Sequence, residues 1–231
     1  MSEAPATKKS KAKTILFKTH SRPKYTVGEE VANAVSHGVG FGLSVAALVL
    51  LIVTAVSHGG GARLAGALFM GITLVIEYLF STLYHAIQAP RGKAVLRVFD
   101  HSCIYLLIAG SYAPFALVTL ADRGGVHLFI FVWVVALLGV VAEAILHERQ
   151  PGWVTTLIYL AMGWAIIFHI GDIYELMPAP GFWLLLAGGI AYSLGVIFYA
   201  FTKVPYMHFI FHLFVLAGST CITLSALLYV V

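Results

Sequence analysis

The last 25 residues begin Met207-His208-Phe209-Ile210-Phe211-His212 and continue to Val231 without a single Lys, Arg, Asp or Glu. An apolar run of about 20 residues has the length that an α-helix needs to cross ~30 Å of hydrocarbon. The two histidines lie on one helix face, about 6 Å apart along the axis, a spacing that suits one transition metal. Titratable groups at the mouth of a membrane helix are costly, so this pair indicates a functional site.

The rest of the chain has the same character, since 60% of its 231 residues are hydrophobic and only 10% are charged. This composition excludes an ordinary soluble domain. Gaps between the charged residues define seven apolar stretches of membrane-spanning length: 38–57, 63–85, 101–121, 126–147, 152–171, 181–202 and 208–230. The sequence therefore predicts an all-α, polytopic membrane protein, a bundle of seven transmembrane helices.

The basic residues predict the orientation of this bundle. With the N-terminus inside, twelve of the fourteen Lys and Arg residues fall in inner segments, and the outer segments hold only Arg63 and Arg123. The positive-inside rule then places the N-terminus in the cytoplasm and the C-terminus outside. The net charge of +4 is explained by this bias, so we predict membrane lipids as partners and no nucleic acid.

The chain divides into two predicted regions. Residues 1–25 are basic and polar, without a secretory signal, and we expect a disordered cytoplasmic arm, with attraction to anionic lipid headgroups as a secondary role. Residues 26–231 form a single transmembrane domain. Thr26-Val27-Gly28-Glu29 resembles a capping box, so a helix starts there and either runs into the first span or breaks near Gly38. We interpret Cys103 and Cys221 as small apolar packing residues inside predicted spans.

Polar residues from distant parts of the chain meet at one predicted depth. His85 ends the second span, Asp100 begins the third, and His208 and His212 begin the seventh, all near the inner interface. His85 also ends a stripe along one face of the second span, in which it follows Glu77 and Ser81 at four-residue spacing. A further stripe of Glu30, Asn33 and His37 precedes the first span on the same side.

These positions suggest a zinc site. His85, His208 and His212 would leave a fourth tetrahedral position for water, the arrangement of a catalytic centre. Asp100 could accept the proton of that water or hold a ligand imidazole, and Ser81 could donate to a developing oxyanion. Other divalent metals could occupy the same site according to supply.

Plainer interpretations remain open for each residue. The histidines could be core residues bonded to carbonyl groups, Asp100 could cap a helix, and Ser81 could bond to its own helix. Glu30, Asn33 and His37 either form a network that anchors the first helix or a solvated face.

Three motifs in order resemble the bacterial haemolysin III-type branch of the progesterone and adipoQ receptor family: Ser81-x-x-x-His85; Asp100-His101-Ser102 with the stretch Tyr105 to Phe115; and His208-x-x-x-His212. Glu30-x-x-Asn33-x-x-x-His37 and Tyr192-x-x-Gly195-x-x-x-Tyr199 resemble it too. The resemblance covers nearly the whole chain from about residue 25. It implies seven helices, a cytoplasmic N-terminus, a bacterial cell (inner) membrane location and zinc held by three histidines, which match His85, His208 and His212, with Asp100 and Ser81 beside them. Glu77 lies outside the motifs.

The leading hypothesis is a zinc-dependent integral-membrane hydrolase that acts on a lipid amide or ester, similar to the ceramidase-like members of that family. A non-enzymatic sensor or regulator with structural zinc is the first alternative, and a channel or pore-forming cytolysin is the second. The oligomeric state is not predicted. Of the other polar residues, we expect His101 to pack at an interface and Glu143 to be exposed or paired with Arg149.

Overall fold

The structure is a computed structural model that describes residues 25–146 and 149–231. Over those residues it is helical, without a strand, and it confirms seven helical segments long and apolar enough to span a membrane. Five of these segments are single helices: α2 (Val27–His58), α3 (Gly61–Ala86), α5 (Gly125–Leu146), α8 (Ala179–Ala200) and α9 (Met207–Tyr229). The third segment, Pro90–Thr119, consists of α4 (Pro90–Pro114) and the π-helical turn η1 (Phe115–Thr119). The fifth segment, Gly152–Leu176, consists of α6 (Gly152–Gly163), the 3-10 turn η3 (Ala165–His169) and α7 (Ile170–Leu176). Apart from Tyr25, the predicted arm lies outside the described residues.

Helix α2 is one unbroken helix, so of the two predicted alternatives the helix runs into the first span and does not break near Gly38. It begins at the predicted capping box, in which the Glu29 amide donates to the Thr26 hydroxyl and the Thr26 amide donates to the Glu29 carboxylate. Its outward face is exposed and apolar, with valines such as Val31 and Val35, and its opposite face is buried and polar. This distribution suits a helix that faces lipid on one side and the bundle on the other.

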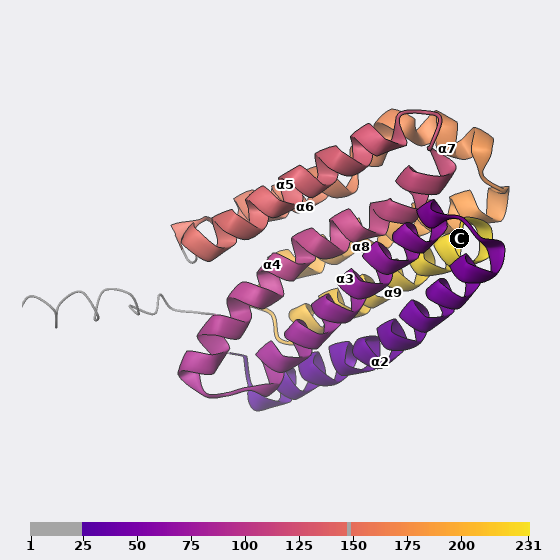
Figure 1. Cartoon of the computed structure of the whole chain (residues 1–231). Helices are drawn as coiled ribbons and strands as arrows, with labels where there is room; N and C mark the ends of the chain where they lie inside the picture. The colour runs from indigo at the N-terminus through magenta and orange to yellow at the C-terminus, as the bar shows by residue number, and fades with distance from the viewer. Residues whose placement is uncertain (1–24, 147–148) are drawn as a thin grey trace, which may run out of the picture.

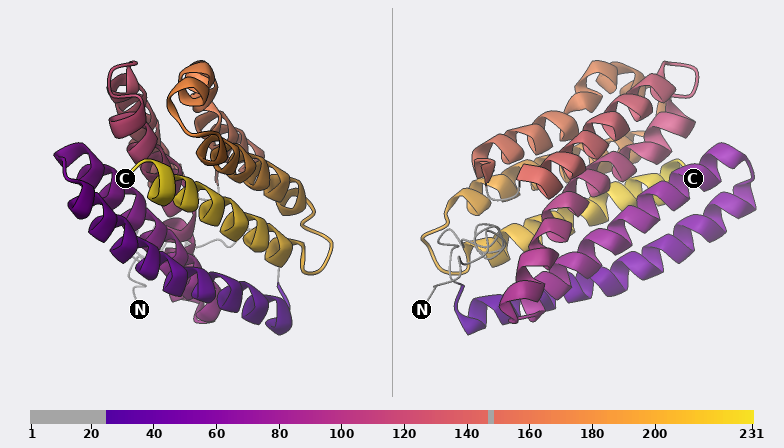
Figure 2. Two further views of the ribbon diagram at one scale, coloured as in Figure 1. Left: turned by 90° about the vertical axis from the view of Figure 1, so that its right-hand side faces the viewer. Right: turned by 60° about the vertical axis from the view of Figure 1, so that its left-hand side comes forward.

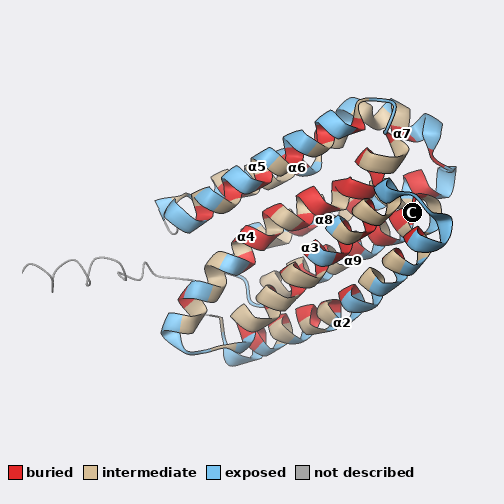
Figure 3. Ribbon diagram, in the orientation of Figure 1, coloured by how far each residue is buried: buried red, intermediate tan, exposed pale blue. Residues whose placement is uncertain are grey.

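The helices run alternately up and down. Helices α2, α4, α6 and α9 begin, and α3, α5 and α8 end, at the same end of the bundle, which we call the proximal end (Figure 1). Helix α3 packs between α2 and α4, α5 packs on α4, and α8 packs on α9. Helix α9 also contacts α2, so the first and last spans are neighbours, as the two views in Figure 2 show. Burial is concentrated where α3, α4 and α9 face one another (Figure 3).

Glycines allow close helix contacts on two sides of α3. A Cβ atom on Gly40 of α2 would lie 2.5 Å from the Tyr78 ring, and one on Gly66 would lie 2.9 Å from the Pro114 backbone. Small residues therefore let α2 and α4 approach α3 from both sides, as in other membrane bundles.

The fifth span, predicted as one continuous stretch, is interrupted between α6 and α7. The Tyr112 hydroxyl of α4 lies 2.7 Å from both the Met162 and the Gly163 carbonyl oxygens, which share its single proton, and it accepts from the Ile166 amide at 3.1 Å. A phenol from a neighbouring helix thus adds hydrogen bonds to backbone groups at the interruption, where a membrane interior offers no water to bond them.

At the opposite, distal end, an arginine pairs with two acidic residues. Arg123, before α5, donates to Asp172 at 2.8 Å and to Glu175 at 3.2 Å. Glu175 and then Asp172 raise the pKa of the Arg123 guanidinium. These exposed pairs join the α4–α5 connection to α7.

Candidate metal centre

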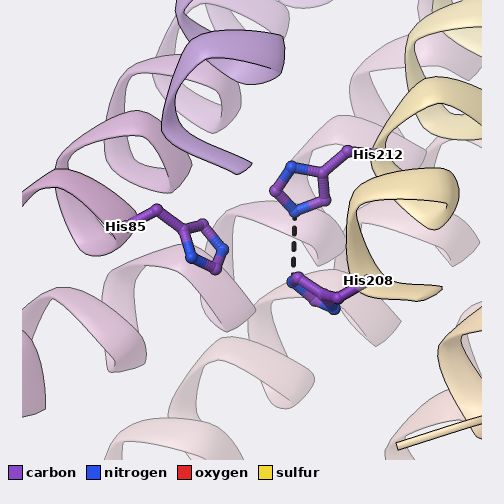
Figure 4. A group of neighbouring side chains, drawn as sticks. All are labelled: His85, His208 and His212. Carbon is purple, nitrogen blue, oxygen red and sulfur yellow. Dashed lines mark hydrogen bonds between the residues drawn. The ribbon is translucent and has the colours of Figure 1, made fainter. Parts of the chain in front are cut away.

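Three histidines meet at the proximal end. His85 comes from the last turn of α3, and His208 and His212 come from the first two turns of α9. One ring nitrogen of each lies within 4.8 Å of the others, and the Nε2 atoms of His208 and His212 are 3.1 Å apart (Figure 4). His85 and His212 are each only 1% exposed. The structure therefore brings together the three residues that the sequence proposed as metal ligands.

Hydrogen bonds at Nδ1 fix the orientation of two of these rings. His85 Nδ1 donates to Glu30 Oε2 at 2.8 Å, and His212 Nδ1 donates to the Asn33 carbonyl oxygen at 3.3 Å. The Ser36 hydroxyl, which itself donates to that carbonyl, lies 3.2 Å from His212 Nδ1. With the proton on Nδ1, each Nε2 keeps its lone pair for a ligand, the arrangement that protein carboxylates and carbonyls give to metal-bound histidines.

The Glu30 carboxylate is itself held by Lys93. Lys93 Nζ lies 2.7 Å from Glu30 Oε1 and donates to the Tyr84 carbonyl oxygen at 3.0 Å. Lys93, Glu30 and His85 thus form a continuous chain from the start of α4 through α2 to the end of α3. Lys93 was not predicted as part of the site, although its place in the first turn of α4 brings it close to the end of the preceding span.

Two more neighbours were also missed. Ser36 lies three residues after Asn33 on the same helix face, so the predicted stripe could have included it. Tyr25 stacks on His208, with ring centroids 5.1 Å apart and planes 27° from parallel. Burial raises the pKa of the Tyr25 phenol, so this residue contributes a neutral ring at the mouth of the site. No sequence pattern marks Tyr25.

His37 lies against the cluster. Its ring stacks on His212 at 3.6 Å between centroids and meets the edge of Tyr78 at 5.0 Å. Both of its ring nitrogens are buried without a hydrogen-bond partner among the described residues. Glu30, Asn33 and His37, predicted as one face, therefore contact His85 or His212 directly.

A cavity of about 420 Å³ opens beside the cluster. Ser81, Asp100 and Glu77 line it together with His208 and His212. Unlike Thr82, whose hydroxyl donates to the Tyr78 carbonyl oxygen, Ser81 makes no hydrogen bond within the described part of the chain. The alternative in which Ser81 bonds to its own helix is thus wrong, and its hydroxyl is available to a cavity occupant.

The cavity changes character along its length. Away from the histidines its wall is largely apolar, with Ile108 and Phe115 from the α4 segment and Leu186 from α8 among the lining residues. An occupant with a polar head and an apolar tail matches such a wall.

The expectation for Glu143 was wrong. It is buried, 3% exposed, and its Oε1 lies 3.4 Å from His101 Nδ1 across the α4–α5 contact. Both residues line the cavity, so His101 is not simply an interface residue. Helix α5 is apolar on nearly every side, which removed the pattern that would have shown which face Glu143 occupies.

The donor set fits a metal ion. His85 Nε2 is buried and has no hydrogen-bond partner in the described chain, which is costly unless a ligand meets it. Tetrahedral zinc with Zn–N bonds of about 2.05 Å separates its nitrogen ligands by about 3.4 Å. The His208–His212 separation of 3.1 Å is close to this value, and the longest separation of 4.8 Å requires the rings to close on the ion.

Fold and site together define a class: a seven-helix membrane protein in which a buried histidine triad at one end of the bundle can hold a metal ion. Comparison with known proteins agrees with the motifs. The family model described as "Haemolysin-III related" matches residues 25–223, and the chain belongs to this family, the haemolysin III branch of the progesterone and adipoQ receptor proteins.

Relatives are found in bacteria and in mammals. The chain is 44% identical to "Hemolysin-3" of Bacillus cereus over 204 residues, which cover 88% of this chain and 93% of that protein. It is 41% identical to "Hemolysin-3 homolog" of Bacillus subtilis (strain 168) over 207 residues, which cover 90% of this chain and 97% of that protein. It is 30% identical to the human "Monocyte to macrophage differentiation factor" over 159 residues, which cover 64% of this chain and 63% of that protein.

Proposed function

We propose that this protein is a zinc-dependent hydrolase of the bacterial cell membrane that cleaves an amide or ester bond of a lipid. The observation that carries the proposal is the histidine triad at the wall of a cavity that also presents Asp100 and Ser81. Three histidine ligands are typical of catalytic zinc, which leaves a position for water and acts as a Lewis acid on that water and on a carbonyl group.

The protein's own residues supply the remaining functions. The Glu30 carboxylate and the Asn33 carbonyl keep the two imidazoles oriented. Asp100, a buried carboxylate on the cavity wall, accepts the proton of the attacking water. The Ser81 hydroxyl donates to the substrate oxygen on which negative charge develops. The apolar wall receives the acyl chain and excludes water from it.

Metal content and lipid turnover test this function in one preparation. The purified protein should carry about one zinc ion, and His212→Ala should remove it, because a two-histidine site binds weakly. His127→Ala, at an exposed histidine in the first turn of α5, is the matched control and should leave the zinc in place. Full zinc occupancy in the His208→Ala/His212→Ala double variant would contradict the assignment.

A panel of labelled lipid amides and esters tests the chemistry. The parent should release the fatty acid, and Asp100→Ala should keep zinc and lose turnover by about 100-fold or more. A different class of function is supported by the way the site ties α2, α3 and α9 together: a sensor or regulator in which zinc is structural. A parent that holds zinc and cleaves none of the lipids would favour that alternative.

The name of the Bacillus relatives refers to haemolysis, and a pore is the remaining alternative. A channel needs a continuous polar path, whereas the polar part of this cavity wall gathers near the histidines and the remainder is largely apolar. Ion flux through reconstituted vesicles that His212→Ala abolishes would support the pore over the hydrolase.

A further inference from the structure

Glu77 is a polar residue of the cavity wall to which the proposed function gives no role. It lies on α3, one turn before Ser81, is 3% exposed and lines the cavity. Its Oε2 atom is buried without a hydrogen-bond partner among the described residues. A buried carboxyl group inside a membrane bundle indicates function, because such a group is costly there.

Glu77 forms no ion pair with a cation among the described residues. The titratable side chains that interact electrostatically with it are Asp100 and Cys103 of α4, Tyr159 of α6, Tyr192 of α8 and Tyr78 of its own helix. No Lys, Arg or His in the described part of the chain lies within ion-pair distance of its carboxyl group. An ionised carboxylate without a partner in such a place is unstable, whereas a neutral carboxyl group is tolerated.

Glu143 provides the contrast within the same cavity. It is equally buried, and its Oε1 atom also makes no hydrogen bond within the described chain, but His101 Nδ1 lies 3.4 Å from that atom, within ion-pair distance, and a protonated His101 can stabilise a negative charge there. The two glutamates thus have similar burial and different partners.

Asp100 of α4 interacts electrostatically with Glu77 of α3, and both side chains line the cavity. Two carboxyl groups close together share one proton more readily than they carry two negative charges. The pair then offers one group that accepts a proton and one that donates a proton, which hydrolysis of an amide requires.

We propose that Glu77 is a neutral carboxyl group that protonates the leaving nitrogen of an amide substrate, while Asp100 accepts the proton of the attacking water. This assignment rests on the proposed hydrolase function and narrows its substrate to amides. The new C–O bond forms from water, the C–N bond breaks, the water proton moves to Asp100 and the Glu77 proton moves to nitrogen. Transfer of the proton from Asp100 to Glu77 then restores the pair, and the products are a carboxylic acid and an amine.

Leaving-group dependence distinguishes this role from a structural one. An amide nitrogen must be protonated before it departs, whereas an activated aryl ester releases a stable phenolate without a proton. Glu77→Gln preserves the shape of the side chain and removes the acidic proton. It should lower amide turnover by about 100-fold or more and leave turnover of the aryl ester of the same acid little changed. Zinc content should equal that of the parent.

Glu143→Gln is the matched control, and it should not change the ratio of amide to ester turnover. Equal losses on both substrates in Glu77→Gln, or the same amide-selective loss in Glu143→Gln, would overturn the assignment. An inactive parent, by contrast, would count against the hydrolase itself.

Infrared spectroscopy tests the protonation state without any turnover. The parent should show the C=O stretching band of a neutral carboxyl group that Glu77→Gln removes and Glu143→Gln retains. A band that persists undiminished in Glu77→Gln would overturn the proposal, whatever the lipid assays show.

Discussion

At the scale of single residues, the hydrogen bonds of the histidine Nδ1 atoms determine which ring nitrogens are free to bind a metal ion. The Nδ1 atoms of His85 and His212 meet a carboxylate and a carbonyl group, so both Nε2 atoms are left for a ligand. The sequence could predict the three histidines, because their places at helix ends set their depth. It could not predict Lys93 or Tyr25, because these reach the site only through the packing of α2, α3 and α4.

Removal of the Glu30 charge should weaken metal binding. Glu30→Gln loses the carboxylate that orients His85, and such changes lower metal affinity about 10- to 100-fold. Zinc affinity measured by competition with a chromophoric chelator checks this expectation. Glu29→Gln is the matched control, because among the described residues Glu29 bonds to Thr26 and the Tyr206 amide and to no histidine. Equal zinc affinity in Glu30→Gln and the parent would contradict the role given to Glu30.

At the scale of helices, the number and type of elements followed from apolar length, and the capping box marked the start of α2. Two features did not follow. The interruption of the fifth span depends on the Tyr112 hydroxyl, which is 50 residues away in sequence from Met162. The buried face of α5 was hidden because that helix is apolar nearly all round, so Glu143 was assigned to the wrong environment.

Tyr112→Phe should destabilise the interruption. Without the phenol hydroxyl, two carbonyl groups and an amide lose a buried partner, at a cost of about 1–3 kcal/mol in the free energy of unfolding. Unfolding of the detergent-solubilised protein, followed by circular dichroism, measures the change. Tyr174→Phe at an exposed tyrosine should have little effect, and equal stability of the two variants would show that the hydroxyl is dispensable.

Gly66→Val should disturb the contact between α3 and α4. Its Cβ would meet backbone atoms of Pro114 that cannot move aside, and overpacking of this kind costs about 1–3 kcal/mol. Gly42→Val tests the same substitution where a Cβ has nothing within 4 Å. The thermal midpoint of Gly66→Val should fall well below that of Gly42→Val. Similar midpoints would mean that the close approach is unimportant.

At the scale of the whole molecule, the seven-helix class was predictable because so few charges interrupt the apolar segments. The cavity was not, since it depends on how residues of α3, α4, α6, α8 and α9 come together around it. The orientation in the membrane remains a prediction from the distribution of Lys and Arg.

Cysteine labelling tests that orientation. In a variant whose native cysteines are replaced by alanine, Asp122→Cys at the distal end should react with a membrane-impermeant maleimide added to intact spheroplasts. Arg91→Cys at the proximal end should react only after permeabilisation, because the basic end faces the cytoplasm. Both positions are exposed, so access is limited by the membrane alone. The reverse pattern would place the histidines on the outer side.

The length of α2 has a mechanical consequence. Its 32 residues extend about 48 Å, well beyond the thickness of the hydrocarbon layer, so a rigid rod joins the aqueous boundary to the interior. Its first turn bonds to the α8–α9 connection through Glu29 and to an imidazole through Glu30. A force applied to the residues that precede Thr26 would therefore be transmitted along this helix, and the Glu30 carboxylate that bonds to His85 would move with it.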